Sequence, residues 1–266
     1  MSYELINHTV KNHVLVIEFN RPKTLNALND QITKETTTAI KKAARDPEIR
    51  AIVITGSGRG FTSGADLSSG DALKAQSNGK PAGMGDHLAK VYHPLIAAIT
   101  SIEKPVIAAV NGITAGIGFG IALACDMTIA SDRAAFTLVF SNIGLVPDGG
   151  VSWMLPRMIG YKKAYELYMT SEKIPADKAH ALGFVNQVVP HDQLMEVTMA
   201  TAEKLASGPT LAFGLTKRAM RQAADQSFGD ALKQEVHHQN TAGRSEDAAE
   251  GVLAFLQKRP ADFKGK

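Results

Sequence analysis

The stretch PVIAAVNGITAGIGFGIALAC, at residues 105–125, decides the fold. Its first residues, 105–110, are apolar and partly β-branched, which predicts a buried strand. A glycine turn follows, then a helix expected over 116–124, and CDMTIA at 125–130 predicts the next strand. Strand, helix and strand in succession indicate helices packed over a largely buried sheet, so we expect a fold of the α/β class.

The chain before this stretch alternates in the same way. HVLVIEFN, at 13–20, predicts a strand, and apolar residues that share one face predict a helix over 29–45 with Asn29 or Asp30 as its N-cap. Residues 50–55 have the pattern of a second short, buried strand, which ends in the glycine-rich GSGRG. We therefore expect a second strand–helix–strand unit upstream of the first.

The remaining segments are a polar loop and several helices. SSGDALKAQSNGKPAGMGD, at 68–86, is rich in glycine and has no periodicity, which predicts a mobile surface loop. A helix is expected at 87–102. Towards the C-terminus the strand patterns end, and apolar stripes over 192–206 and 245–257 predict helices.

The amino-acid composition limits the classes of protein to which this chain can belong. The chain has 266 residues, of which 44% are hydrophobic and 21% charged, as in soluble globular proteins. We expect a core at 1–190 and a smaller C-terminal helical region at 191–266. No secretory signal or apolar span of about 18–20 residues is visible, which favours a cytoplasmic protein with no membrane partner.

Charge and cysteine content exclude several functions. The net charge of +3 is too small to predict a nucleic-acid partner. The single cysteine, Cys125, excludes an internal disulfide and a Cys-based zinc site, and we expect no metal. Cys125 lies in an apolar context typical of an inert core thiol. The neighbouring Asp126 is expected to bond backbone amides of a nearby turn.

Two glycine clusters follow predicted strands, at 56–60 and 116–120. Both have the spacing G-x-G-x-G and lack the features of a dinucleotide fingerprint or a P-loop, so we expect no nucleotide cofactor. Tight turns and close packing are one interpretation of these glycines. Alternatively, if two such turns faced each other, their unpaired backbone amides would hold the oxyanion of a thioester enolate.

Several motifs, in order along the chain, resemble the crotonase (enoyl-CoA hydratase/isomerase) superfamily. They are Asn20-Arg-Pro-x-x-x-Asn26-Ala-Leu28, Phe61-Thr-Ser-Gly-Ala-Asp-Leu67, Lys104-Pro-Val-Ile-Ala-Ala-Val-Asn-Gly112, Gly144-Leu-Val-Pro-Asp148, Leu155-Pro-Arg157-x-x-Gly160 and Ala179-x-x-Leu-Gly-Phe-Val-Asn186. The resemblance implies a spiral of β-β-α units with a C-terminal helical trimerisation region. It therefore also implies a homotrimer, or a hexamer made as a dimer of trimers.

The resemblance also implies an acyl-CoA substrate, whose thioester oxygen is held by the backbone amides of Ala65 and Ile117. Coenzyme A is part of this substrate, so no separate cofactor is expected. The implied substrate-binding residues are Lys23, Ala27, Ser63, Ala65, Asp66, Leu67, Ser68, Ile117 and Gly118.

The chain departs from the hydratases of the family at two positions. The hydratases carry glutamates where this chain has Gly120 and Phe140. Hydration needs one group to activate water and another to protonate C2, and neither residue can do so. The resemblance therefore favours an isomerase, in which Asp148 removes a proton from one carbon and returns it to another. Within the superfamily the chain is most similar to the isomerases of phenylacetate breakdown and of enoyl-CoA double bonds.

Other interpretations stay open. Asp148 could simply cap a helix that starts near residue 150. The chain could be a hydratase with an unrecognised second acid, or Asp148 could attack an aromatic ring as a nucleophile. A protein that kept the fold could also bind acyl-CoA or RNA without catalysis. His87 and His93 are expected at the surface, and Ser63 lacks the G-x-S-x-G context of a nucleophile.

Overall fold

The computed structural model describes residues 3–68, 76–77, 80–81 and 84–266. Most of the loop expected at 68–86 lies outside these residues. Two described pieces of it pair as antiparallel strands, β5 (Gln76–Ser77) and β6 (Lys80–Pro81), and its last residues, 84–86, belong to a helix and not to a loop.

The core is built from a β-β-α unit that recurs along the chain. In each unit the first strand joins one sheet and the second joins another, and helices follow. The sequence 105–125 forms one such unit, as β7, β8 and α5. The repeat accounts for β3 (Ala51–Gly56), β4 (Gly60–Thr62), β7 (Val106–Val110), β8 (Ile113–Ala115), α5 (Ile117–Ala124), β9 (Met127–Ser131), β10 (Ala135–Thr137) and α6 (Val151–Ile159).

The larger sheet has six strands in the order β1-β2-β3-β7-β9-β12, and the smaller has four in the order β11-β10-β8-β4. An antiparallel hairpin of β1 (Ile6–Lys11) and β2 (Val14–Phe19) starts the larger sheet, and its other pairs are parallel. At its far edge lies β12 (Gln187–Val189), while β11 (Ile174–Pro175) pairs antiparallel with β10.

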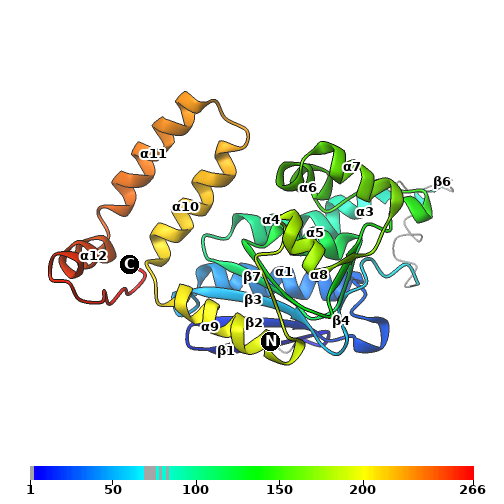
Figure 1. Cartoon of the computed structure of the whole chain (residues 1–266), viewed down its shortest axis with the longest axis horizontal. Coiled ribbons are helices and arrows are strands. Elements are labelled where there is room, and N and C mark those ends of the chain that lie inside the picture. The colour runs from blue at the N-terminus through cyan, green and yellow to red at the C-terminus, as the bar shows by residue number, and fades with distance from the viewer. Residues whose placement is uncertain (1–2, 69–75, 78–79, 82–83) are drawn as a thin grey trace.

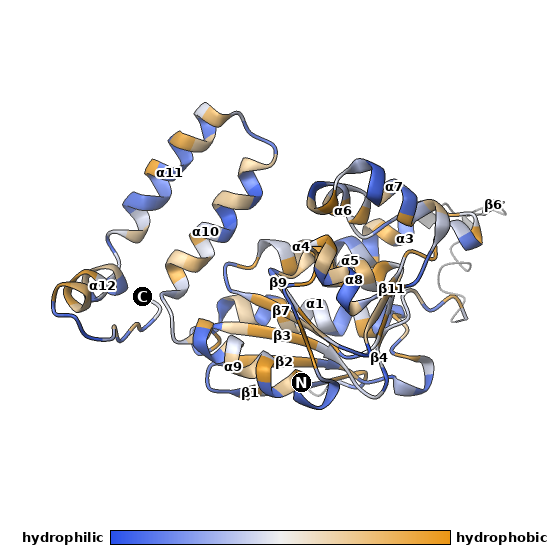
Figure 2. Cartoon of the chain, viewed as in Figure 1, coloured by the Kyte–Doolittle hydropathy of each residue, from blue (hydrophilic) through white to orange (hydrophobic). Residues whose placement is uncertain are grey.

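The central strands are buried on both faces, because helices cover each side of the larger sheet. Every residue of β3 and β7 is buried, which explains their continuous apolar sequences. On one face α9 (Leu194–Ala206) packs with Leu194, Ala202 and Ala206 against Val53. The other face belongs to the main core, which includes residues of α1 (Asp30–Arg45), α4 (His93–Ser101) and α5. Figure 2 shows the apolar strands enclosed by these helices.

After α9 an arm of helices extends away from the core (Figure 1). Its first helix, α10, is attached to the core by an ion pair of 2.7 Å between Lys217 and Asp126. Its last helix, α12, exposes Val252, Phe255 and Leu256. The arm consists of α10 (Thr210–Ala223), α11 (Phe228–Ala242) and α12 (Glu246–Leu256).

Most of the expected elements are confirmed. Asn29 caps α1 by accepting a hydrogen bond from the Ile32 amide, and Ser245 caps α12 in the same way. The helix expected at 87–102 differs, because it is interrupted by a π-helical turn. It comprises α3 (Met84–His87), the π-helical turn η2 (Leu88–Tyr92) and α4. The other helices are α7 (Tyr161–Thr170) and α8 (Ala176–Leu182), with short 3₁₀ turns η1 (Pro22–Thr24), η3 (Ser141–Ile143) and η4 (His191–Gln193).

Within the described part of the chain, none of the helices is long and apolar enough to cross a membrane.

Candidate active site

The first turn of the site follows β4 and contains Ala65. The backbone of Leu28 brackets it: the Leu28 amide donates to Gly64 O at 2.8 Å, and the Asp66 amide donates to Leu28 O at 3.0 Å. These two bonds leave the N–H of Ala65 itself pointing away from Leu28. Within the described part of the chain this N–H donates no hydrogen bond. It is therefore available to a ligand.

The second turn leads into α5. Gly116 has φ +53°, a left-handed conformation that favours glycine, and α5 begins at Ile117. The first amides of a helix have no acceptor within it, and they lie at the positive end of its dipole. The Ile117 amide, like that of Ala65, makes no hydrogen bond to another described residue. Ile117 is almost fully buried, so α5 presents this amide within a protected site.

The two turns are in contact, which the glycine spacing alone could not establish. A Cβ placed on Gly64 would lie 2.8 Å from Ala115 O, and one placed on Gly118 would lie 2.3 Å from Thr62 Cγ2. Only glycine permits these approaches. Each contact lies within three residues of Ala65 on one turn and within two residues of Ile117 on the other. The two turns that carry these amides are therefore neighbours, as one shared oxyanion site would require, and the sharing itself stays a proposal.

Asp148 lies on a segment that packs on the start of α5. The next two residues, Gly149 and Gly150, have φ of +59° and +77°. A Cβ placed on Gly149 would lie 2.2 Å from Ile117 Cδ1 and 3.8 Å from Gly120 Cα. The double-glycine turn therefore brings Asp148 against the helix that provides the second amide.

The carboxyl group of Asp148 is partly buried and has a raised pKa. Its buried Oδ1 has no hydrogen-bond partner among the described residues. Burial raises the pKa of Asp148 from its ordinary 3.8 to about 6, because the charged form loses hydration that the protein does not replace. The interpretation of Asp148 as a helix cap is wrong. α6 begins at Val151 with Gly150 as its N-cap, and no side chain caps it.

The two positions that carry glutamate in hydratases are occupied without any acid. A Cβ placed on Gly120 would lie 2.8 Å from Gly149 O, so the turn that carries Asp148 takes up the space of a side chain there. Phe140 is buried, and its ring tip would lie 4.0 Å from a Cβ on Gly116. An apolar ring therefore lies beside the turn that leads to the Ile117 amide.

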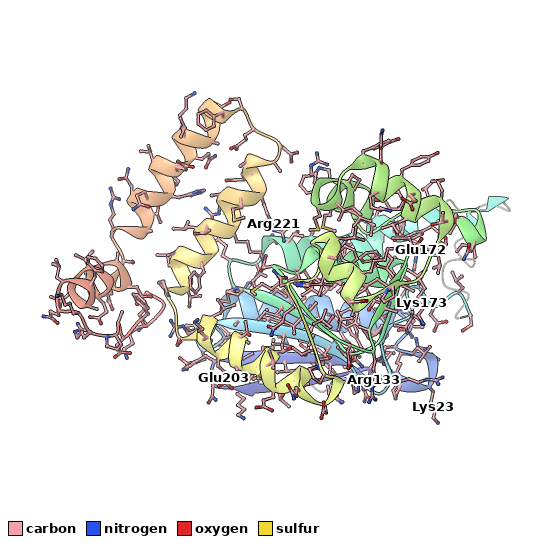
Figure 3. The ribbon with its side chains drawn as sticks, viewed as in Figure 1. Lys23, Arg133, Glu172, Lys173, Glu203 and Arg221 are labelled. Carbon is pink, nitrogen blue, oxygen red and sulfur yellow. The ribbon has the colours of Figure 1, made fainter. Side chains whose placement is uncertain are left out.

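The proposed substrate-binding residues divide into exposed and buried groups. Leu67 and Ser68 are exposed beside the first turn, and Lys23 projects from the edge of the molecule (Figure 3). Ala27 and Gly118 are buried: Ala27 precedes Leu28, which pairs with the first turn, and Gly118 lies in the first turn of α5.

Three of these side chains, those of Ser63, Asp66 and Ser68, have partners within the protein. The Ser63 hydroxyl donates to Thr24 O at 3.0 Å. The Asp66 carboxylate is 2.8 Å from Arg21 Nη1 and accepts hydrogen bonds from Ser68. The roles of the whole set in substrate binding stay proposals.

Sequence reasoning missed Arg21 and Tyr92. Arg21 lies in the Asn-Arg-Pro motif, which marked the family but gave no role to this side chain. Tyr92 donates to Leu28 O at 3.0 Å from the π-helical turn η2. Of the two histidines expected at the surface, His93 is exposed, whereas the His87 side chain is only 11% exposed and lies 2.7 Å from Asp30.

The remaining candidate groups lie away from this site. Cys125 is buried and burial raises its pKa, as expected for an inert thiol. Asp126 accepts from a backbone amide at 2.9 Å, as expected, but this amide belongs to Val106 at the start of β7 and not to a turn. A cavity of about 650 Å³ opens between α10 and the core, but none of Ala65, Ile117 and Asp148 lines it. Among the described residues, no cluster of three or more potential metal-binding side chains occurs.

Comparison with known proteins supports one family. The family model for enoyl-CoA hydratase/isomerase matches residues 9–266. The 1,2-epoxyphenylacetyl-CoA isomerase of Escherichia coli (strain K12) is 38% identical, over 99% of each chain. A Rhodobacter capsulatus protein named "Probable enoyl-CoA hydratase" is 40% identical over 100% of each chain. The crystal structure of enoyl-CoA hydratase from Bacillus anthracis superimposes with a TM-score of 0.91 at 29% identity, and the match covers 99% of this chain and 100% of that one.

These matches extend over nearly the whole chain and agree with the spiral of β-β-α units. The names of the relatives include both isomerases and hydratases, so they establish the family without choosing between the two reactions. The chain is an enzyme of the enoyl-CoA hydratase/isomerase family, which acts on CoA thioesters.

Proposed function

We propose that this enzyme isomerises a CoA thioester, with Asp148 as the only acid–base group and the amides of Ala65 and Ile117 as the oxyanion site. The observation that carries the proposal is the Asp148 carboxyl group. It belongs to the residue before Gly149, which packs on the start of α5; its buried Oδ1 has no partner among the described residues, and its pKa is about 6. A base with this pKa is well suited to take and return a proton near neutral pH.

The proposed reaction can be written for a 3-enoyl-CoA. Asp148 removes a proton from C2, and the electron pair moves onto the thioester oxygen, where the two amides stabilise the enolate. Protonated Asp148 then returns the proton to C4, the double bond forms between C2 and C3, and the oxyanion collapses to the carbonyl. The proton leaves and returns, so the reaction consumes no water and needs no redox cofactor.

Hydration is disfavoured because the site offers no second acid or base at the two positions that hydratases use. A carboxylate at position 120 would need the space of the Gly149 carbonyl, and position 140 holds a buried phenyl ring. At position 140 a water would meet an apolar ring in place of the base of a hydratase. These features support isomerisation over hydration.

Two kinds of acyl group are candidates for the substrate. The relative that isomerises 1,2-epoxyphenylacetyl-CoA supports a ring-epoxide substrate, which would give an oxepin. A straight-chain 3-enoyl-CoA would need the same site, because in both reactions the enzyme must stabilise an anion at the thioester oxygen. We therefore propose a CoA thioester isomerase and name these as its two candidate substrates.

Product analysis tests the proposal. Purified enzyme is incubated separately with a 3-enoyl-CoA, with the ring-epoxide of phenylacetyl-CoA and with crotonyl-CoA. The products are separated from unreacted substrate by chromatography, and their masses are then measured. The proposal predicts at least one product with the mass of its substrate. If crotonyl-CoA gains the mass of water rapidly while neither of the other substrates changes, the enzyme is a hydratase and the proposal is wrong.

We also propose that the enzyme forms a trimer, or a hexamer made as a dimer of trimers. The basis is the apolar surface of the arm, where α11 exposes Phe228 and Val236 and α12 exposes Phe255 and Leu256. Apolar side chains of this size in neighbouring helices are typical of a surface that another subunit covers.

A further inference from the structure

The turn that carries Ala65 is held by a charged pair that lies outside the proposed reacting groups. Arg21 Nη1 is 2.8 Å from Asp66 Oδ2, and the two side chains are 20% and 6% exposed. Nη1 also donates to Ala27 O. One guanidinium therefore joins the two segments of backbone, 27–28 and 64–66, that pair around Ala65.

The second carboxylate oxygen of Asp66 is also hydrogen-bonded. Its Oδ1 accepts from the Ser68 amide at 3.1 Å and from the Ser68 hydroxyl at 2.6 Å. The Ser68 hydroxyl, with the adjacent Arg21 cation, keeps the pKa of Asp66 below its ordinary value. The carboxylate is thus ionised at neutral pH. Asp66 is fixed from both sides, and its backbone amide bonds Leu28 O at 3.0 Å.

Arg21 is itself fixed through Asn26. The Arg21 amide donates to Asn26 Oδ1 at 2.9 Å, and the Asn26 amide donates back to Arg21 O at 2.9 Å. Asn26 Nδ2 reaches Ser57 O and Gly60 O, which lie beside the start of β4. The position of the guanidinium is therefore set by the core rather than by solvent.

We propose that Arg21 and Asp66 are positioning residues, which aim the Ala65 amide at the thioester oxygen by fixing the peptide units on each side of it. This inference rests on the proposed function. Neither residue touches the reacting atoms; they act through the backbone. An amide contributes most to catalysis when it is already oriented before charge develops, and a small misplacement can cost about 10²-fold in rate.

The expected effect separates positioning from simple folding. In Arg21→Gln or Asp66→Asn the Ala65 amide still exists, so the ground-state substrate should bind within about threefold of its normal affinity. The transition state should lose part of the oxyanion interaction, so kcat should fall by roughly 10–100-fold. Because the pair acts as a unit, the double variant should be no slower than the worse single variant.

Infrared spectroscopy of a bound thioester gives a readout that folding alone would not change. Octanoyl-CoA labelled with ¹³C at the carbonyl cannot be isomerised, and its C=O stretch falls in frequency when amides polarise the bond. The wild type should show this fall. Arg21→Gln and Asp66→Asn should lose part of it, while Arg45→Gln, which removes an exposed arginine at the end of α1, should keep all of it.

If Arg21→Gln does not fold, Arg21→Lys is the variant to measure in its place. It keeps the positive charge, but its ammonium cannot reproduce the planar fork of the guanidinium, so an intermediate carbonyl shift is expected.

The outcomes are distinct. A wild-type carbonyl frequency in Asp66→Asn and Arg21→Lys would overturn the inference, even if kcat fell, because the pair would then serve only folding. If the wild type itself caused no carbonyl shift, the proposed thioester site would be wrong, and the inference would fall with it.

Discussion

Replacing Asp148 by asparagine should make the protein more stable at neutral pH. The cause is the half-buried carboxylate, whose Oδ1 has no partner among the described residues and whose pKa is raised from 3.8 to about 6. At about 1.4 kcal/mol for each pKa unit, this rise corresponds to about 3 kcal/mol of lost stability when the group is ionised. Solvent reaches the group in part, so we expect roughly 1–2 kcal/mol.

The effect should depend on pH in a defined direction. Below pH 3.8 the carboxyl group is protonated in both folded and unfolded chains, and it costs nothing. Between pH 3.8 and about 6 the folded chain binds more protons than the unfolded chain, so stability falls as pH rises. Above about pH 6 the loss is complete. Asparagine does not ionise, so the variant should gain most above pH 6 and nothing near pH 3.5.

Calorimetric melting of the two proteins at several pH values measures this difference. For a chain of this size, 1–2 kcal/mol corresponds to a rise in Tm of roughly 3–6 °C at pH 7. Asp225→Asn is the control, because Asp225 is exposed in the turn between α10 and α11. The reasoning fails if Asp148→Asn melts at or below the wild type at pH 7, or if the difference is the same at pH 4.

Three further predictions follow from the site and the arm. Gly120→Ala should lower kcat for isomerisation by roughly tenfold or more, because the added Cβ would lie 2.8 Å from Gly149 O and displace Asp148. Gly229→Ala is the control. An unchanged kcat in Gly120→Ala would contradict the close packing of Gly120 on Gly149. Crotonyl-CoA should be hydrated far more slowly than by a true hydratase assayed beside it, and comparable loss of enoyl absorbance would refute the role given to Gly120 and Phe140. Light scattering should report a trimer or a hexamer, and Phe255→Asp should weaken the association of the subunits. A monomeric wild type would exclude the proposed assembly.

Sequence patterns predicted the fold where burial is periodic or complete. The apolar runs that became β3 and β7 are buried at every residue, and Asn29 and Ser245 cap the helices that they were expected to cap. The short second strands β4, β8 and β10 have three residues each, too few for a period, and only the family resemblance implied them. The π-helical turn η2 lies inside a helix pattern that appeared continuous, so nothing local marked it.

Sequence motifs named the residues of the candidate site, whose roles stay predictions, but they did not show the contacts between them. The motifs pointed to Ala65, Ile117 and Asp148, and the structure adds that the two turns touch through Gly64 and Gly118. Local sequence could not decide whether Asp148 caps a helix, because a proline before it and glycines after it suit both a cap and a tight turn. Contacts between distant segments, such as Arg21 with Asp66, carry no local signal at all.

The central claim is that one carboxylate moves the proton, and the turnover of Asp148→Asn tests it most directly. The assay follows the conversion of a 3-enoyl-CoA to a 2-enoyl-CoA, with octanoyl-CoA affinity measured by calorimetry on the same preparation. Asparagine keeps the shape but accepts no proton, so kcat should fall by roughly 10²–10⁴-fold while affinity changes by less than about threefold. In the wild type, kcat/KM should fall about tenfold per pH unit below about pH 6. Turnover by Asp148→Asn at close to the wild-type rate would show that Asp148 is not the base.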